Sequence, residues 1–138
     1  MNKCEKAVEN HKKGYNCAQA VACVFADELG CGEDELFRLT EAFGGGMGGT
    51  QGICGAVSAM VLAAGKMKSF GTEKLPETNK KASYQAARGL MESFAQKVGS
   101  ALCSEIKGNR LCTCDGCIEQ AVKILEEFIE KTKADVKP

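Results

Sequence analysis

The sequence has no excess of charge of either sign and no long run of apolar residues. It carries 18 basic and 18 acidic side chains, whereas a general nucleic-acid binder usually shows a strong basic excess. No segment approaches the roughly 18 apolar residues that a membrane helix needs. The first residues also lack the apolar stretch of a signal peptide. We therefore expect a cytoplasmic protein with neither nucleic-acid nor membrane partners.

Histidine and the standard catalytic motifs are also scarce. His11 is the one histidine, and we interpret it as a surface residue because its neighbours are polar. Any Cys–His catalysis would depend on it alone. The sequence has no metalloprotease HExxH, no nucleophile elbow and no dinucleotide-binding glycine fingerprint. Enzymatic activity therefore stays open, with an oxidoreductase as the candidate class.

The composition is that of one globular domain. Apolar residues make up 44% of the chain and charged residues 26%, which are ordinary globular values. A chain of 138 residues fits one domain. It buries roughly two-thirds of its unfolded surface, so its core needs no disulfide. We treat residues 1–138 as a single domain.

Cysteine is the residue that the chain has in excess. The nine cysteines are Cys4, Cys17, Cys23, Cys31, Cys54, Cys103, Cys112, Cys114 and Cys117. A reducing cytoplasm disfavours structural disulfides, so many cysteines there indicate metal, cluster or redox chemistry. Free cysteine also serves as a small buried hydrophobic residue, and we expect three or four of the nine to do so.

Helical periodicity runs through nearly the whole chain and predicts an all-α fold, a compact bundle of about six to seven helices. Caps and glycine stops place the helices at about 3–13, 17–29, 33–43, 54–68, 78–98, 100–106 and 115–133. A segment with six glycines in nine residues, 44–52, cannot be a regular helix. The small-residue helix after it could pack within the chain or across a homodimer.

Four predicted helices begin with a cysteine in or beside the first turn. Cys17, Cys54 and Cys103 each follow a cap or the glycine-rich loop, and Cys114 and Cys117 bracket the start of the last helix. Unpaired N–H groups and positive partial charge at a helix N-terminus stabilise thiolate, the form that binds metals and attacks disulfides. If these starts converge, they form a thiolate pocket suited to an iron–sulfur cluster or a soft metal ion.

The glycine-rich loop would help to hold such a group. Because glycine has no side chain, the loop backbone can come close to a bound cluster. The amides of Gly45, Gly46 and Gly48 could then donate hydrogen bonds to cluster sulfurs. The alternative is a loop that only turns the chain between two packed helices. A phosphate-binding loop is disfavoured because the GxxxxGK[ST] pattern is absent and a helix precedes the loop.

Two other interpretations of the cysteines stay open. Cys114 and Cys117 form a C-x-x-C motif, which favours a metal-free thiol–disulfide enzyme in which Cys17 or Cys114 attacks and Cys117 resolves. A structural zinc site is the second, because four thiolates suit tetrahedral zinc. Neither the zinc-ribbon nor the ferredoxin cysteine spacing is present, so distant segments must assemble any four-cysteine site.

Several segments together resemble the C_GCAxxG_C_C family of redox-active proteins. They are Gly14–Val21, Ala42–Gly48 and Cys54–Ser58, followed by an isolated cysteine and by one at the start of the last helix. The resemblance covers nearly the whole chain, and a similar domain of split-Soret cytochromes implies electron transfer with a redox partner protein and an iron–sulfur centre. Where the family pattern closes with glycine, this chain has Ala59. By position, the four family cysteines fall on Cys17, Cys54, Cys103 and Cys114, with Cys117 able to substitute for or assist Cys114.

Overall fold

The computed structural model describes residues 1–135, in which every regular element is a helix. In chain order the elements are α1 (Lys3–Lys13), α2 (Cys17–Cys23), α3 (Ala26–Leu29), α4 (Glu33–Thr40), the 3₁₀ turn η1 (Glu41–Phe43), α5 (Gly55–Lys68), α6 (Lys80–Val98), α7 (Cys103–Gly108) and α8 (Cys114–Asp135). The all-α prediction is therefore confirmed. None of the helices described is both long enough and apolar enough to cross a membrane.

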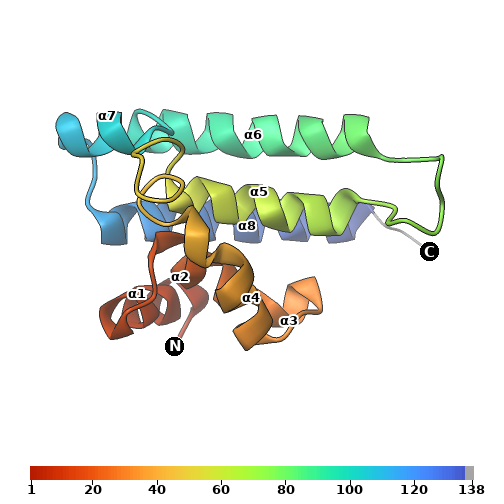
Figure 1. Cartoon of the computed structure of the whole chain (residues 1–138), viewed down its shortest axis with the longest axis horizontal. Coiled ribbons are helices and arrows are strands. Elements are labelled where there is room, and N and C mark those ends of the chain that lie inside the picture. Colours follow the sequence, from red (N-terminus) through yellow and green to blue (C-terminus); the bar gives the residue numbers. More distant parts are fainter. Residues whose placement is uncertain (136–138) are drawn as a thin grey trace.

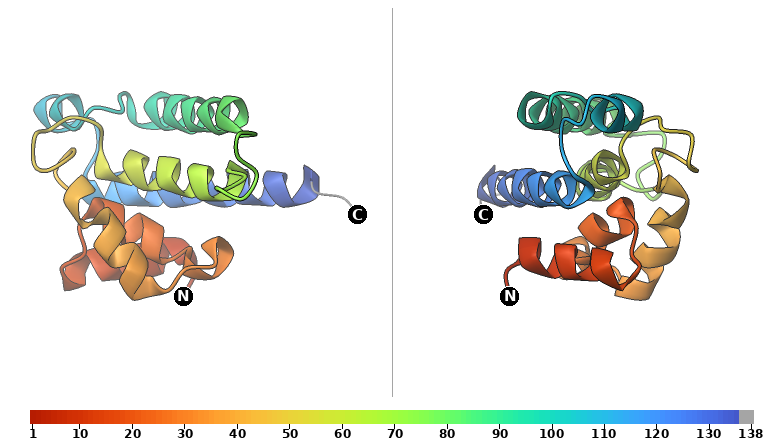
Figure 2. Two further views of the ribbon diagram at one scale, coloured as in Figure 1. Left: turned by 45° about the vertical axis from the view of Figure 1, so that its right-hand side comes forward. Right: turned by 90° about the vertical axis from the view of Figure 1, so that its left-hand side faces the viewer.

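The helices lie in three layers (Figure 1). Helices α6 and α7 follow one another in the upper layer, and α5 and α8 lie beneath them, side by side in the right-hand view of Figure 2. The third layer contains α1 to α4. Helix α5 contacts α2, α6 and α8, and its first half is buried, including Ala59. A helix of small residues therefore occupies the centre of the fold.

Large apolar side chains fill the spaces between these layers. The largest fully buried ones include Phe25 at the break before α3, Leu36 in α4, Met60 in α5, Phe94 in α6 and Ile118 in α8. Burying a side chain of this size contributes about 1.5–3 kcal/mol. One core therefore connects all three layers and holds the helix starts in place.

One predicted helix, 17–29, is interrupted in the structure. Helix α2 ends at Cys23, and α3 begins at Ala26. The Phe25 N–H donates to the Ala22 carbonyl, a tighter i to i−3 bond (N···O 3.0 Å). Because Phe25 is fully buried at this break, core packing overrides the helical periodicity of the segment.

Other helix boundaries differ by a few residues. The predicted helix 33–43 becomes 3₁₀ from Glu41, and the predicted 78–98 begins at Lys80. The Asn79 side chain donates to the Lys68 carbonyl (2.7 Å), which ties the start of α6 to the end of α5. The predicted helix 100–106 begins only at Cys103, because the residues before it pair with the segment after the glycine-rich loop.

Candidate functional site

Six of the nine cysteines line one cavity of about 50 Å3. They are Cys17, Cys54, Cys103, Cys112, Cys114 and Cys117. Helices α2, α7 and α8 each begin at a cysteine of this set, and Cys54 caps the start of α5. In Figure 1 the starts of α5 and α8 lie at the same end of the molecule, beside α7. The helix starts that carry these cysteines therefore converge on the cavity, and the role of the cysteines as ligands stays a prediction.

A short antiparallel backbone pairing brings Cys54 and Cys103 together. The Cys54 N–H donates to the Ala101 carbonyl (2.8 Å), and the Cys103 N–H donates to the Gly52 carbonyl (2.7 Å). The side chains are almost fully buried, with exposed fractions of 6% for Cys54 and 7% for Cys103. The pairing therefore fixes two sulfurs from residues 49 positions apart in the sequence (103 − 54).

Cys17 is positioned by a capping box at the start of α2. The Asn16 side chain accepts from the Gln19 N–H (3.0 Å), and the Gln19 side chain accepts from the Asn16 N–H (2.9 Å). The Asn16 amide also donates to the Glu41 carbonyl (2.8 Å). A Cβ at Gly44 would overlap this amide. The cap thus joins the start of α2 to the entry of the glycine-rich loop.

The glycine-rich loop forms one wall of the cavity through Gly45 and Gly46. Both have positive φ (64° and 73°), and a Cβ on either would lie within 2.8 Å of loop backbone. In the described part of the chain, their amides donate to no backbone carbonyl, so an acceptor in the cavity could engage them. Gly48, predicted with them, is not among the lining residues, and its amide donates to the Ala42 carbonyl (2.8 Å).

The environment of Cys54 favours its thiolate. Its pKa falls from 9.0 to about 7, chiefly because the Cys117 thiol donates a hydrogen bond to its sulfur. The amides of Ala56 and Val57, at the start of α5, and the charge of Lys107 lower the pKa further, whereas burial raises it. The stabilising effect of a helix N-terminus, expected from the sequence, therefore acts on this cysteine.

The neighbouring thiols oppose one another's ionisation. Burial, together with the nearby Cys114 and Cys54 sulfurs, raises the pKa of Cys17 to about 12. The pKa of Cys117 is raised by its hydrogen bond to Cys54 and by burial. A positive group in the cavity would remove this repulsion, because metal coordination deprotonates a thiol. The cavity can therefore hold several thiolates together only when a cation accompanies them.

Thiolates and backbone amides are the kinds of group that hold an iron–sulfur cluster. Among the residues described, no group of three or more His, Cys, Asp or Glu side chains is arranged to hold a metal ion. A single zinc would need four ligand atoms at about 2.0–2.3 Å from one point. A cluster binds thiolates on separate irons and accepts hydrogen bonds at its sulfurs. Six thiols and two loop amides around one cavity supply both kinds of group.

The remaining three cysteines lie elsewhere: Cys23 belongs to the core, and Cys4 and Cys31 pack against it. Their thiols donate to backbone carbonyls: Cys4 to Glu119 (3.7 Å), Cys23 to Glu33 (3.7 Å) and Cys31 to Leu29 (3.5 Å). This agrees with the expectation that three or four cysteines serve as small apolar residues.

Four residues that line the cavity were missed by the sequence reasoning: Gly55, Ile106, Lys107 and Cys112. Cys112 is not one of the cysteines that the family pattern selects, although it stands only two residues before Cys114. Lys107 is the one charged residue among the described residues that line the cavity. It stands four residues after Cys103, on the same face of α7, and this spacing is the signal that could have found it.

His11 is not the simple surface residue that the sequence suggested. It is half-buried, and its Nδ1 lies 2.8 Å from an Asp115 carboxylate oxygen. Asp115 follows Cys114 directly, so the pair ties α1 to the start of α8. His11 itself is not among the residues that line the cavity.

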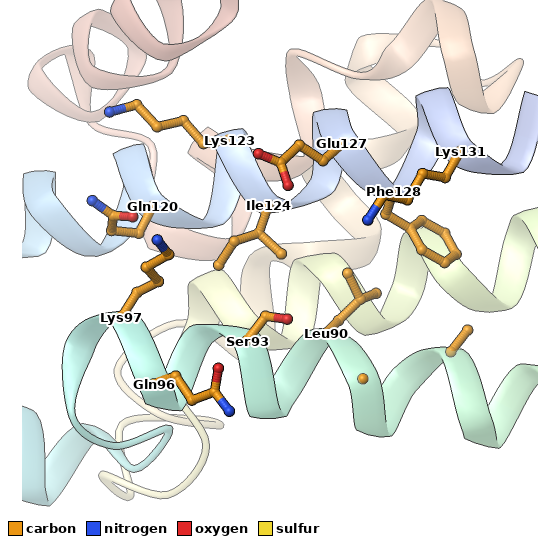
Figure 3. Close-up of a pocket in the computed structure, with 12 residues that line it drawn as sticks. Leu90, Ser93, Gln96, Lys97, Gln120, Lys123, Ile124, Glu127, Phe128 and Lys131 are labelled. Carbon is orange, nitrogen blue, oxygen red and sulfur yellow. The ribbon is translucent and has the colours of Figure 1, made fainter.

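A larger groove of about 440 Å3 lies between α6 and α8 (Figure 3). Leu90, Ile124 and Phe128 supply its apolar surface, with Lys97 and Lys123 among the charged side chains around it. None of the lining residues is a cysteine. The groove is therefore separate from the thiol chemistry of the cavity.

One family model matches residues 15–128, and its description is "Putative redox-active protein (C_GCAxxG_C_C)". The matched segment includes all six cysteines of the cavity. No curated protein and no solved structure shows significant similarity to the chain.

Proposed function

The chain belongs to the C_GCAxxG_C_C family of redox-active proteins, and we propose that its cavity holds an iron–sulfur cluster used for electron transfer. The observation that carries the proposal is the gathering of six sulfurs from four chain segments around one cavity. The ligands in this proposal are Cys17, Cys54, Cys103 and Cys114, one from each converging helix start. A bound cluster would supply one-electron transfer.

The residues around the ligands would set the redox potential. Amides of Gly45 and Gly46 are available to bond cluster sulfurs, and such hydrogen bonds raise the potential of a cluster. The positive charge of Lys107 would also stabilise the negative charge that a cluster gains on reduction, which raises the redox potential. Burial of Cys54 and Cys103 limits the access of water on that side.

Cys114 supports the proposal of a redox partner protein. Its side chain is exposed, whereas Cys54, Cys103 and Cys117 are buried. A ligand at the surface shortens the path between a cluster and a docked partner. We therefore propose that electrons enter or leave at the start of α8.

The test is the iron and acid-labile sulfide content of protein purified without oxygen, together with its visible spectrum. We expect iron and sulfide in similar amounts and broad visible absorption. Cys54→Ser should lose most of both, because it removes a ligand at the best-stabilised thiolate. Cys31→Ser is the matched control and should retain both, since its sulfur bonds to Leu29 outside the cavity.

Other results would support the alternatives. Zinc in place of iron, without a redox couple, would indicate a structural metal site. Metal-free protein with a reversible two-electron couple would indicate a thiol–disulfide enzyme. Unchanged iron, sulfide and spectrum in Cys54→Ser would contradict the ligand assignment.

A further inference from the structure

We propose that Cys112 and Cys117 form a second redox centre, a dithiol that reduces small external disulfides. The two residues line the same cavity as the four proposed ligands, and neither belongs to that set of four. The inference rests on the proposed function only in assigning Cys54 and Cys114 to the cluster. It extends that function from one-electron to two-electron chemistry.

The backbone at the start of α8 folds the two cysteines toward each other. The Gly116 N–H donates to the Thr113 hydroxyl (2.9 Å), and the Cys117 N–H donates to the Thr113 carbonyl (2.9 Å). These bonds turn residues 112–117 back over the first turn of the helix. Both residues line the same narrow cavity, and Cys112 is close enough to help to raise the pKa of Cys117, so one sulfur can reach the other with little backbone movement.

Gly116 makes this arrangement sterically feasible. A Cβ at position 116 would lie 2.5 Å from the Cys112 sulfur, which is far inside a van der Waals contact. Glycine within a helix is less favourable than alanine. At position 116, the absence of a side chain leaves room for the Cys112 sulfur.

Burial assigns different roles to the two thiols. Cys112 is half-buried and can be reached from solvent, whereas the exposed fraction of Cys117 is 3%. Cys112 is therefore the attacking thiol and Cys117 the resolving thiol. Because Cys112 is only half-buried at the edge of a narrow cavity, a small flexible disulfide such as oxidised glutathione reaches its sulfur from the solvent side more easily than the disulfide of a folded protein.

The exchange has two balanced steps. The Cys112 sulfur attacks one sulfur of the external disulfide, which forms a mixed disulfide and releases the first thiol. The Cys117 sulfur then attacks Cys112, which forms the Cys112–Cys117 disulfide and releases the second thiol. The protons of Cys112 and Cys117 end on the two released thiols. The protein loses two electrons, and the external disulfide gains them.

The test uses the full-length protein, purified without oxygen and treated with oxidised glutathione. After an acid quench, free thiols are alkylated and the protein is digested with trypsin. Cleavage after Arg110 and Lys123 yields one peptide that contains Cys112, Cys114 and Cys117. Further cleavage before Asp115 separates Cys112 and Cys114 from Cys117. We expect two fragments joined by a disulfide, with the alkyl group on Cys114.

Two variants test the geometry. Cys112→Ser should abolish the internal disulfide but retain the iron content of the wild type. Gly116→Ala keeps every thiol and should lower the yield of the disulfide at least several-fold, because the new methyl group displaces the Cys112 sulfur. Gly89→Ala in α6 is the matched control, since a Cβ there meets no atom within 4 Å. This control should form the disulfide as the wild type does.

Three outcomes would overturn the inference. They are a disulfide that joins Cys117 to Cys54 or Cys114, a Gly116→Ala variant that forms the Cys112–Cys117 disulfide normally, and a Cys112→Ser variant that loses its iron. Absence of iron in the wild type would contradict the proposed function alone, because the disulfide mapping does not depend on it.

Discussion

Replacing Gly55 with alanine would push apart the two helix starts that carry Cys17 and Cys54. Gly55 is the first residue of α5 and also lines the cavity. A Cβ there would lie 3.2 Å from the Ala18 nitrogen and 3.3 Å from the Phe43 carbonyl oxygen. Both neighbours are backbone atoms, so relief requires movement of α2 or of the loop entry.

The size of the effect follows from two opposing terms. Overpacking of this kind costs about 1–3 kcal/mol, whereas the higher helix propensity of alanine returns up to about 1 kcal/mol. The matched variant Gly65→Ala changes the same helix where a Cβ meets no atom within 4 Å. Gly65→Ala therefore has the higher helix propensity of alanine without a steric clash. We therefore expect Gly55→Ala to be less stable than Gly65→Ala by about 1–3 kcal/mol.

Urea unfolding of the reduced, metal-free proteins, followed by far-UV circular dichroism, measures this difference. Gly65→Ala should match or exceed the wild type, and Gly55→Ala should unfold at lower urea. Equal free energies of unfolding in the two variants would refute the close approach of α5 to α2. The same result would remove the packing argument for bringing Cys17 near Cys54.

Two further predictions concern the core and the pH dependence. Phe94→Ala should lower the free energy of unfolding by about 3–5 kcal/mol, because the ring is fully buried; a loss well below this range in urea unfolding would contradict that placement. The second prediction concerns Tyr15, whose hydroxyl donates a hydrogen bond to Glu33; this bond raises the pKa of Tyr15 from 10.0 to about 12. The variant Tyr84→Phe leaves Tyr15 as the only tyrosine. In this variant, phenolate absorption should appear near pH 12. The stabilising contribution of this neutral phenol is complete below pH 10 and is lost as the pH rises through 12, so a titration midpoint at 10 would exclude the bond.

Local signals predicted most of the helix ends. The Asn16 cap acts within four residues, and Gly14, Gly30 and Gly99 end helices in the left-handed conformation that glycine adopts easily. Such features depend on neighbouring residues alone. For the same reason, the positions of Cys17 and Cys54 at helix starts could be read from the sequence.

Contacts between distant segments could not be predicted in this way. The backbone pairing of Cys54 with Ala101 involves too few residues to produce an alternating strand pattern. The break at Phe25 depends on core packing, and the place of Cys112 depends on the space above Gly116. Each of these features depends on contacts in the assembled fold, so the periodicity of one segment cannot predict it.

Iron-edge X-ray absorption of the protein purified without oxygen tests the central claim most directly. The proposed site predicts iron surrounded by sulfur atoms, with a second iron at short range. Cys54→Ser should lose this signal, and Cys31→Ser should keep it. Iron bound mainly by oxygen or nitrogen, or no iron in the wild-type protein, would contradict the proposal that the cysteine cavity holds a cluster.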